Sequence, residues 1–316
     1  MQVTLQQAVA LLKNGQVVAI PTETVYGLAA DATNDAALRQ IFSIKQRPMD
    51  NPLIVHIADA SEVDNWVDEF SPMAKKLAQA FWPGPFTLVL PAIESVSKVV
   101  RGNQPTVALR VPSHPLALQV LIQSGLALAA PSANKFTQLS PTTPAHVVSG
   151  LGESIAILDG GACSVGIEST IVSVKGDDWQ LLRLGMITEG EIQKVAGKPA
   201  LKNEKDNTPK APGQHLQHYS PVTPIRLFNT RNALLNYAQN IKTSFATLII
   251  NAADQWPFEL KCEYITLPNQ AELAAAQLYS TMHQLDKLDV AEILIEMPPN
   301  RPEWLAVIDR LTRAAN

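Results

Sequence analysis

Short apolar segments alternate with amphipathic segments along the first 195 residues of this 316-residue chain. Such apolar runs, several of them rich in Val and Ile, are typical of buried strands. We expect strands at Val17–Ile20, Leu53–Ile57, Phe86–Leu90, Val107–Val111, Leu126–Ala130, Ile155–Leu158, Thr170–Val174 and Gln180–Leu184. We expect helices at Leu5–Lys13, Ala36–Ile44, Pro72–Phe81, Pro115–Gln123 and directly after Pro144. Strands with helices between them predict an α/β domain with a sizeable mixed sheet.

A polar stretch separates this pattern from a second one. Residues 196–222 are polar, charged and interrupted by prolines, so we interpret them as an interdomain linker. Beyond them we expect strands at Ile225–Phe228, Ala246–Asn251 and Ala291–Glu296, and helices at Asn232–Gln239, Gln270–Leu285 and Arg301–Leu311. The sequence therefore predicts an N-terminal α/β domain of residues 1–195, the linker, and a small C-terminal α/β open-sheet domain of residues 223–316.

Charge and cysteine content argue against several classes of protein. The net charge is −4 and the pI about 5.9, whereas a protein that holds nucleic acid by general electrostatics needs a basic face. Cys163 and Cys262 lack the spacing of a zinc or redox motif, and no metal ligand is expected from protein side chains. No apolar run has the length of a membrane span and no signal peptide is visible, so we expect a cytoplasmic protein without membrane contact.

The common nucleotide-binding and hydrolase motifs are missing. The sequence contains no GxxxxGK[ST] loop, no GxGxxG between a strand and a helix, no HExxH and no GxSxG. Any nucleotide site must therefore be built in another way.

Polar residues follow the strand that ends at Ile20. Thr22, Glu23, Thr24 and Tyr26 come directly after it, and ligands bind at the carboxyl ends of strands in open α/β sheets. These side chains could present hydroxyls and a carboxylate to a small ligand. The alternative is a solvated turn with a buried tyrosine.

Two basic residues, Lys45 and Arg47, form a second candidate feature. Pro48 disfavours helical backbone at Arg47, so the preceding helix should end near there. In extended chain, side chains two residues apart point the same way, and both cations could then reach one polyphosphate. The alternative is an ordinary basic helix C-terminus, which the helix dipole favours.

Two further polar features lie in or after apolar strands. His56 could be a hydrogen-bonded core residue or a functional one, and Arg110, as a buried charge, needs an acidic side chain or a ligand carboxylate as partner. Ser132 and Asn134 follow a strand and share one side of an extended segment.

Taken in order, the segments PTETVYGLAADA, KQRP, NPLIVHI, TVALRVP, APSAN, ESTIV and LLRLG resemble the YrdC-like family of threonylcarbamoyl-AMP synthases. The resemblance covers about residues 3–190, and the chain beyond looks like the long two-domain form. It implies a twisted open mixed sheet around a concave cavity. It also implies a nucleotidyltransferase that condenses L-threonine, bicarbonate or CO₂, and ATP with Mg²⁺ to threonylcarbamoyl-AMP and pyrophosphate. Separate transferase proteins would then use this product to modify a tRNA adenosine.

The resemblance also implies two sets of site residues. The ATP set is Lys45, Arg47, Asn51, Thr106, Ser132, Asn134, Ser140, Arg183 and Tyr219, with Lys45 and Arg47 as the catalytic cations. The L-threonine set is Thr24, His56, Arg110, Ala130 (through its backbone) and Ser169. The resemblance implies two nucleophiles, the threonine amine and then a carbamate oxygen, and both belong to the substrates. The protein's task would therefore be placement and charge stabilisation. His56 and Glu23 both remain candidates for the group that takes the amine proton.

The linker departs from the family pattern. Gln214-His215-Leu216-Gln217 replaces a more basic stretch, while His218-Tyr219-Ser220-Pro221 keeps the pattern. The resemblance implies that the linker closes over the cavity with Tyr219 near ATP. Two other functions stay open: an RNA-binding accessory protein without turnover, and a carbamoyl-transfer module. The pI argues against the first, and the second usually carries acylphosphatase-like and zinc-finger segments that are not visible here.

Overall fold

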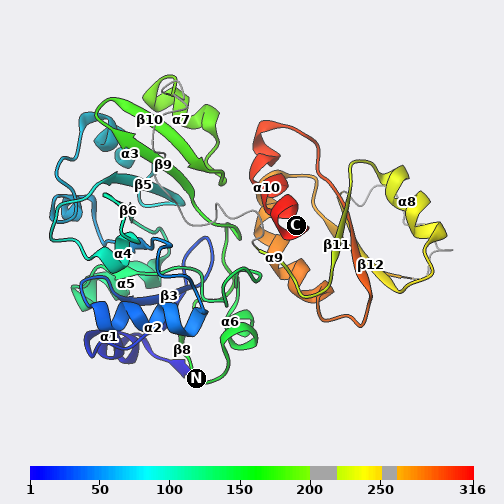
Figure 1. Ribbon diagram of the computed structural model, residues 1–316, viewed down its shortest axis with the longest axis horizontal. Helices are drawn as coiled ribbons and strands as arrows, with labels where there is room; N and C mark the ends of the chain where they lie inside the picture. Colours follow the sequence, from blue (N-terminus) through cyan, green and yellow to red (C-terminus); the bar gives the residue numbers. More distant parts are fainter. Residues whose placement is uncertain (200–218, 251–261) are drawn as a thin grey trace.

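The computed structural model describes residues 1–199, 219–250 and 262–316. Within these ranges the chain forms a ten-stranded sheet and a separate four-stranded sheet, each with its own helices (Figure 1). The proposed domains of residues 1–195 and 223–316 each enclose one of these sheets. Most of the expected linker, residues 200–218, lies outside the described residues.

The larger sheet is mixed, as the sequence predicts. Its strands are β1 (Gln2–Val3), β2 (Val18–Ile20), β3 (Gly27–Asp31), β4 (Ile54–His56), β5 (Phe86–Pro91), β6 (Thr106–Arg110), β7 (Leu128–Ala129), β8 (Ala156–Leu158), β9 (Thr170–Lys175) and β10 (Asp178–Arg183). They lie in the order β1-β8-β2-β3-β7-β4-β6-β5-β9-β10. Parallel pairs such as β4–β6 and antiparallel pairs such as β5–β6 alternate irregularly, which confirms the expected mixed α/β fold.

The helices of this domain are α1 (Leu5–Lys13), α2 (Asp35–Lys45), α3 (Pro72–Phe81), α4 (Lys98–Arg101), α5 (Pro115–Ser124), α6 (Pro144–Leu151) and α7 (Glu189–Ala196). Their starts follow the sequence signals. At α1, Gln7 N donates to Thr4 Oγ1 at 3.3 Å while Thr4 N donates to Gln7 Oε1 at 2.8 Å, a complete capping box. Helix α3 begins with Pro72 behind the cap Ser71.

Two strands of this sheet are not predicted by sequence. Strand β3 has the sequence Gly-Leu-Ala-Ala-Asp, which lacks the β-branched and aromatic residues typical of strands. It forms because β2 and β7 pair with it on both sides. Strand β1 has two residues and is held by β8 alone.

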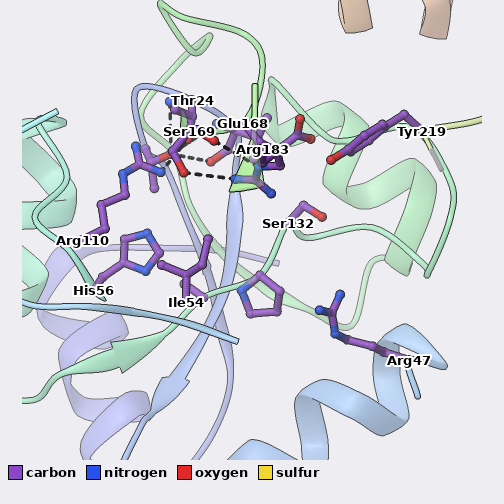
Figure 2. Close-up of a pocket in the computed structure, with 14 residues that line it drawn as sticks. Thr24, Arg47, Ile54, His56, Arg110, Ser132, Glu168, Ser169, Arg183 and Tyr219 are labelled. Carbon is purple, nitrogen blue, oxygen red and sulfur yellow. Dashed lines mark hydrogen bonds between the residues drawn. The ribbon is translucent and has the colours of Figure 1, made fainter. Parts of the chain in front are cut away.

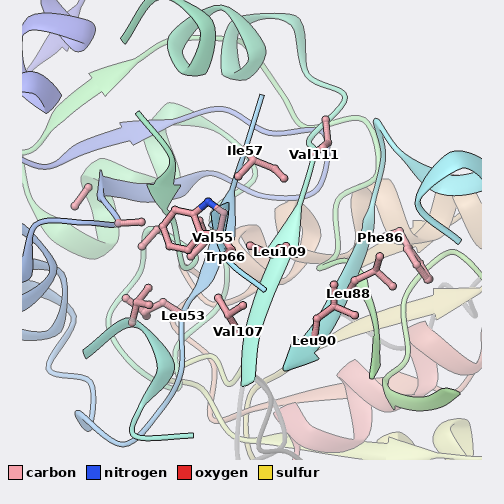
Figure 3. Packing of buried hydrophobic residues seen from close by; sticks show 14 of the residues in the cluster. Leu53, Val55, Ile57, Trp66, Phe86, Leu88, Leu90, Val107, Leu109 and Val111 are labelled. Carbon is pink, nitrogen blue, oxygen red and sulfur yellow. The ribbon is translucent and has the colours of Figure 1, made fainter. Parts of the chain in front are cut away.

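Alternation along the central strands creates the core and leaves a second face for polar residues. Side chains at every second position of the segments around β4, β5 and β6 pack into one apolar cluster: Leu53, Val55, Ile57, Phe86, Leu88, Leu90, Val107, Leu109 and Val111 (Figure 3). Successive side chains of a strand point to opposite faces. The intervening positions, including His56 and Arg110, therefore lie on the other side of the sheet.

The C-terminal domain has an all-parallel sheet. Its strands are β11 (Ile225–Phe228), β12 (Phe245–Ile250), β13 (Glu263–Leu267) and β14 (Glu292–Glu296), in the order β11-β14-β12-β13. Its helices are α8 (Arg231–Asn240), α9 (Ala271–Leu285) and α10 (Leu305–Ala314). Strand β13, whose sequence begins with two exposed residues, is not predicted by the apolar pattern.

Helices α9 and α10 lie on the side of this domain that faces the N-terminal domain (Figure 1). One buried apolar cluster contains Val25, Leu139 and Ile167 together with residues of both helices. Gly166 has φ +78°, and a Cβ there would lie 2.4 Å from the carbonyl oxygen of Ala275 on α9. The two domains therefore pack backbone against backbone at this glycine. None of the helices in the described parts of the chain combines the length and apolar character of a membrane span.

Candidate functional site

Strands β4 and β6 aim two polar side chains at one cavity. In the parallel pairing of these strands, His56 lies directly opposite Arg110. Both face away from the main apolar cluster and line a cavity together with Ile54. Figure 2 shows His56 and Arg110 at one end of this cavity and Arg47 and Tyr219 at the other, with Ser169 and Arg183 between them.

Arg110 has an acidic partner within the protein. Its Nη2 lies 2.7 Å from Oε1 of Glu23, its Nη1 donates to Thr24 Oγ1 at 3.0 Å, and its Nε donates to the carbonyl of Gly84 at 3.1 Å. Burial by itself raises the pKa of Glu23, but the charge and hydrogen bond of Arg110 outweigh it and hold that pKa below its usual value. Of the two partners left open by sequence, the structure shows the acidic side chain.

His56 is a neutral imidazole at physiological pH. It is buried, and burial together with the neighbouring charge of Arg110 lowers its pKa to about 3. An imidazole in this state can donate or accept a hydrogen bond but carries no charge toward a ligand.

The segment between β2 and β3 is a buried polar turn. Thr22 Oγ1 donates to the carbonyl of Val25 at 2.7 Å and lies 2.8 Å from Thr24 Oγ1. Both threonines are almost fully buried, which excludes the solvated-turn alternative, and both line the cavity. Gly27 begins β3, where an added Cβ would lie 3.0 Å from that of Ala130. This glycine therefore lets the turn approach the segment after β7.

The structure brings only one of the two cations of the KQRP segment to the cavity. Helix α2 ends at Lys45, and Gln46 turns the chain with φ +53°. Arg47 then lines the cavity and donates to the carbonyl of Pro52 at 2.9 Å. Lys45 is buried elsewhere, and its Nζ donates to the carbonyls of Ser132 and Asn134 at 2.6 Å each. This corrects the expectation that both side chains point at one anion.

Burial changes the proton affinity of both cations. It lowers the pKa of Lys45 well below its usual value, and the charge of Arg47 adds to that effect. Burial also lowers the pKa of Arg47 to about 10. Arg47 nevertheless stays charged at physiological pH and can meet an anion in the cavity.

The segment after β7 forms another wall. Ser132 lines the cavity, whereas Asn134 turns away from it and its Nδ2 donates to the carbonyls of Lys135 and Gln138. The two side chains predicted to share one side therefore diverge. Lys45, the last residue of α2, therefore ties this segment to that helix through both carbonyls.

Ser169 and Arg183 form the wall between the two ends. Arg183 donates from Nε to the carbonyl of Ser169 at 3.0 Å and from Nη2 to its Oγ at 3.1 Å. Ser169 Oγ also lies 2.8 Å from Thr87 Oγ1. Glu168 joins this wall, and its carboxylate accepts a hydrogen bond from Ser140 Oγ at 2.6 Å.

Nine of the residues that the resemblance assigns line this one cavity: Thr24, Arg47, His56, Arg110, Ala130, Ser132, Ser169, Arg183 and Tyr219. Five others do not: Lys45, Asn51, Thr106, Asn134 and Ser140. Lys45 and Ser140 touch wall residues from behind. Thr106 lies at the opposite end of β6 from Arg110, roughly 13 Å along the strand at about 3.3 Å per residue.

Thr22, which the sequence already placed among candidate ligand-facing residues, lines the cavity, whereas Glu168 was missed although it adjoins Ser169. Period-two alternation places a neighbour on the opposite face only in regular strands. Glu168 lies before β9 begins, where that rule does not apply. Among the described residues, no group of three or more His, Cys, Asp or Glu side chains is arranged to hold a metal ion.

Comparisons with known proteins cover both domains. A family model described as "Telomere recombination" matches residues 10–185, and one described as "Threonylcarbamoyl-AMP synthase, C-terminal domain" matches residues 187–316. The threonylcarbamoyl-AMP synthase of Bacillus subtilis is 38% identical over 98% of this chain and 92% of its own length. That of Pyrococcus abyssi is 35% identical over 98% of this chain and 93% of its own.

A solved structure matches at the same extent. The crystal structure of P. abyssi Sua5 complexed with L-threonine is 34% identical in sequence, with a TM-score of 0.88. The match covers 98% of this chain and 94% of the P. abyssi chain.

Proposed function

Since the chain belongs to the threonylcarbamoyl-AMP synthase family of enzymes, we propose that it condenses L-threonine, bicarbonate or CO₂, and ATP to threonylcarbamoyl-AMP and pyrophosphate. One observation carries the proposal. A single cavity presents Arg110, Thr24 and His56 at one end and Arg47 and Tyr219 at the other, with Arg183 between them.

The first end suits a small amino acid. A guanidinium has five N–H donors, and the three contacts of Arg110 with Glu23, Thr24 and Gly84 leave donors for a substrate carboxylate. The hydroxyls of Thr24 and Ser169 are candidates to hydrogen-bond the threonine side chain. Such a site discriminates strongly against analogues that lack the hydroxyl. L-threonine bound to the P. abyssi relative supports this assignment.

The second end suits a nucleotide. The charges of Arg47 and Arg183 attract phosphates, and a guanidinium can bind phosphate oxygens through two parallel hydrogen bonds. Tyr219 supplies an aromatic surface beside them. Mg²⁺ enters with ATP as part of the substrate, bound mainly by phosphate oxygens and water. Lys45 acts as a positioning residue here, because it holds the carbonyls of the segment that carries Ser132.

The chemistry needs no protein nucleophile. The threonine amine attacks CO₂ and loses a proton, which gives a carbamate. A carbamate oxygen then attacks the α-phosphorus of ATP, and the bond from that phosphorus to the leaving pyrophosphate breaks. The protein aligns the reactants and offsets negative charge on the phosphates through Arg47 and Arg183. Separate transferase proteins would consume the adenylate in forming a modified tRNA adenosine.

Pyrophosphate release tests the proposal. We expect release that requires ATP, bicarbonate and L-threonine together, and a severe loss in the variant that carries Lys45→Ala and Arg47→Ala. A matched control carries Lys75→Ala and Lys76→Ala, which removes the same charge from exposed positions of α3. Normal threonine-dependent release by the Lys45 and Arg47 double variant would contradict the assignment of these residues.

A further inference from the structure

A buried arginine of the C-terminal domain reaches the cavity wall of the N-terminal domain. Arg310 on α10 donates from Nε to Glu168 Oε2 at 2.8 Å and from Nη2 to the carbonyl of Leu184 at 2.9 Å. Its side chain has no exposed surface. Glu168 lines the cavity, and Leu184 directly follows Arg183. One guanidinium therefore contacts the wall at two points beside the proposed phosphate end.

Donors from both domains surround the carboxylate of Glu168. Ser140 of the N-terminal domain donates at 2.6 Å, and the hydroxyl of Tyr279 on α9 donates to Oε2 at 3.1 Å. Burial alone raises the pKa of Glu168, but the charges of Arg310 and Arg183 and the hydrogen bonds from Ser140 and Arg310 outweigh it and lower the pKa to about 2. Glu168 is therefore a fixed negative charge in the wall.

The same guanidinium also supports the aromatic residue of the cavity. The Cζ atom of Arg310 lies 5.0 Å from the ring centroid of Tyr219, within the range of a cation–π contact. The ring of Tyr279 lies 5.8 Å from that of Tyr219, centroid to centroid. Side chains of α9 and α10 therefore pack against the Tyr219 ring and hold it in position.

A buried carboxylate beside a polyphosphate is unfavourable unless a cation compensates it. Repulsion between like charges is strong where water is scarce. Arg310 supplies that compensation from the side of Glu168 that faces the C-terminal domain. With Glu168 neutralised in this way, Arg47 and Arg183 give the phosphate end a net positive charge.

We propose that Arg310, assisted by Tyr279, is a positioning residue for ATP: it neutralises Glu168 and fixes Tyr219 in the wall of the nucleotide end. The C-terminal domain thereby completes the ATP site without contributing a group that touches the phosphates. This inference rests on the proposed function, because it takes ATP as the ligand of that end.

A merely structural role for Arg310 in joining the domains makes a different prediction. Loss of domain packing would weaken the binding of ATP and of L-threonine alike. Charge compensation instead affects ATP more than L-threonine, and removal of the carboxylate charge relieves the defect. The affinities for the two substrates therefore separate the roles.

The test compares Arg310→Met, Glu168→Gln and the double variant in the full chain, with Kd values for ATP and for L-threonine from titration calorimetry. We expect Arg310→Met to raise the Kd for ATP about tenfold or more, because the uncompensated carboxylate of Glu168 then repels the phosphates. The Kd for L-threonine should change less than about twofold, and Glu168→Gln in the double variant should restore most of the ATP affinity. The matched control is Arg226→Met, because Arg226 also pairs with a carboxylate, Glu292, and lies 4.7 Å from a tyrosine ring, but away from the cavity.

Two results would overturn the inference: an Arg310→Met variant that binds ATP as the wild type does, or a double variant that binds ATP no better than Arg310→Met alone. If Arg310→Met fails to fold, Tyr279→Phe removes only one hydroxyl from Glu168, and an unchanged Kd for ATP there counts equally against it. The proposed function fails separately, if the wild-type chain binds ATP but releases no pyrophosphate with L-threonine and bicarbonate.

Discussion

Replacement of Arg110 by methionine separates its structural role from its proposed substrate role. Methionine keeps much of the apolar stem but leaves Glu23, which is 4% exposed, as a buried charge without its partner. Breaking a buried ion pair from one side costs about 3–5 kcal/mol. The carbonyl of Gly84 loses its donor as well, so we expect a loss of unfolding free energy in the upper part of this range.

A second substitution then removes the stranded charge. Glu23→Gln in the Arg110→Met background leaves no buried carboxylate, and replacement of both partners of a buried pair is often close to neutral. We therefore expect the double variant to regain more than about half of the lost unfolding free energy. If Arg110 also holds the threonine carboxylate, the double variant should still lack threonine-dependent turnover.

The assay measures denaturant unfolding and threonine-dependent pyrophosphate release in the same three proteins. Arg101→Met is a control for the loss of an arginine with backbone partners, since Arg101 donates to the carbonyls of Val96 and Gln104 away from the cavity. A double variant that recovers both stability and turnover would refute the reasoning. Arg110 would then be only the structural partner of Glu23.

Three further predictions follow from the same contacts. Gly166→Ala should lower the unfolding free energy by about 2–4 kcal/mol, because the added methyl group clashes with α9 and the left-handed backbone disfavours alanine. Gly161→Ala, at φ +76° with open space around it, should lose only the backbone contribution of about 1–2 kcal/mol. Equal losses in thermal unfolding would contradict this prediction. The imidazole signal of His56, assigned by comparison with His56→Asn, should not titrate between about pH 5 and 8, since its pKa is about 3; a midpoint near 6.5 would be contrary to the structure. The pKa of Glu168 is about 2 in the folded protein and 4.5 for the ordinary group. Its contribution to the unfolding free energy is therefore complete above pH 4.5 and is lost as the pH falls toward 2. Glu168→Gln should flatten that loss in acid unfolding curves.

Most of the fold follows from local sequence signals. Capping residues and prolines mark the helix starts, as at Thr4 and Ser71, and apolar runs mark the central strands. Strand β3 is not predicted from these signals, because its small residues form a strand only through pairing with β2 and β7. Pairing with distant neighbours, which decides such a segment, leaves no periodic pattern in the segment itself.

The site is likewise predictable only where its geometry follows from local rules. Strand register explains why His56 and Arg110 face one cavity, because alternation along paired strands is a local rule. The bonds of Lys45 to two carbonyls depend on where the chain turns at Gln46, a left-handed residue that no local signal marks. The contact of Glu168 with Arg310 joins residues 142 positions apart, and only the packing of the two domains reveals it.

Conversion of labelled bicarbonate is the most direct measure of the proposed activity. The full chain is incubated with ATP, Mg²⁺, labelled bicarbonate and L-threonine, and the products are separated to detect a labelled adenylate. We predict a labelled adenylate and an equal amount of pyrophosphate, both dependent on L-threonine. RNA binding without any adenylate, or pyrophosphate release driven by carbamoyl phosphate in place of bicarbonate and L-threonine, would contradict the account.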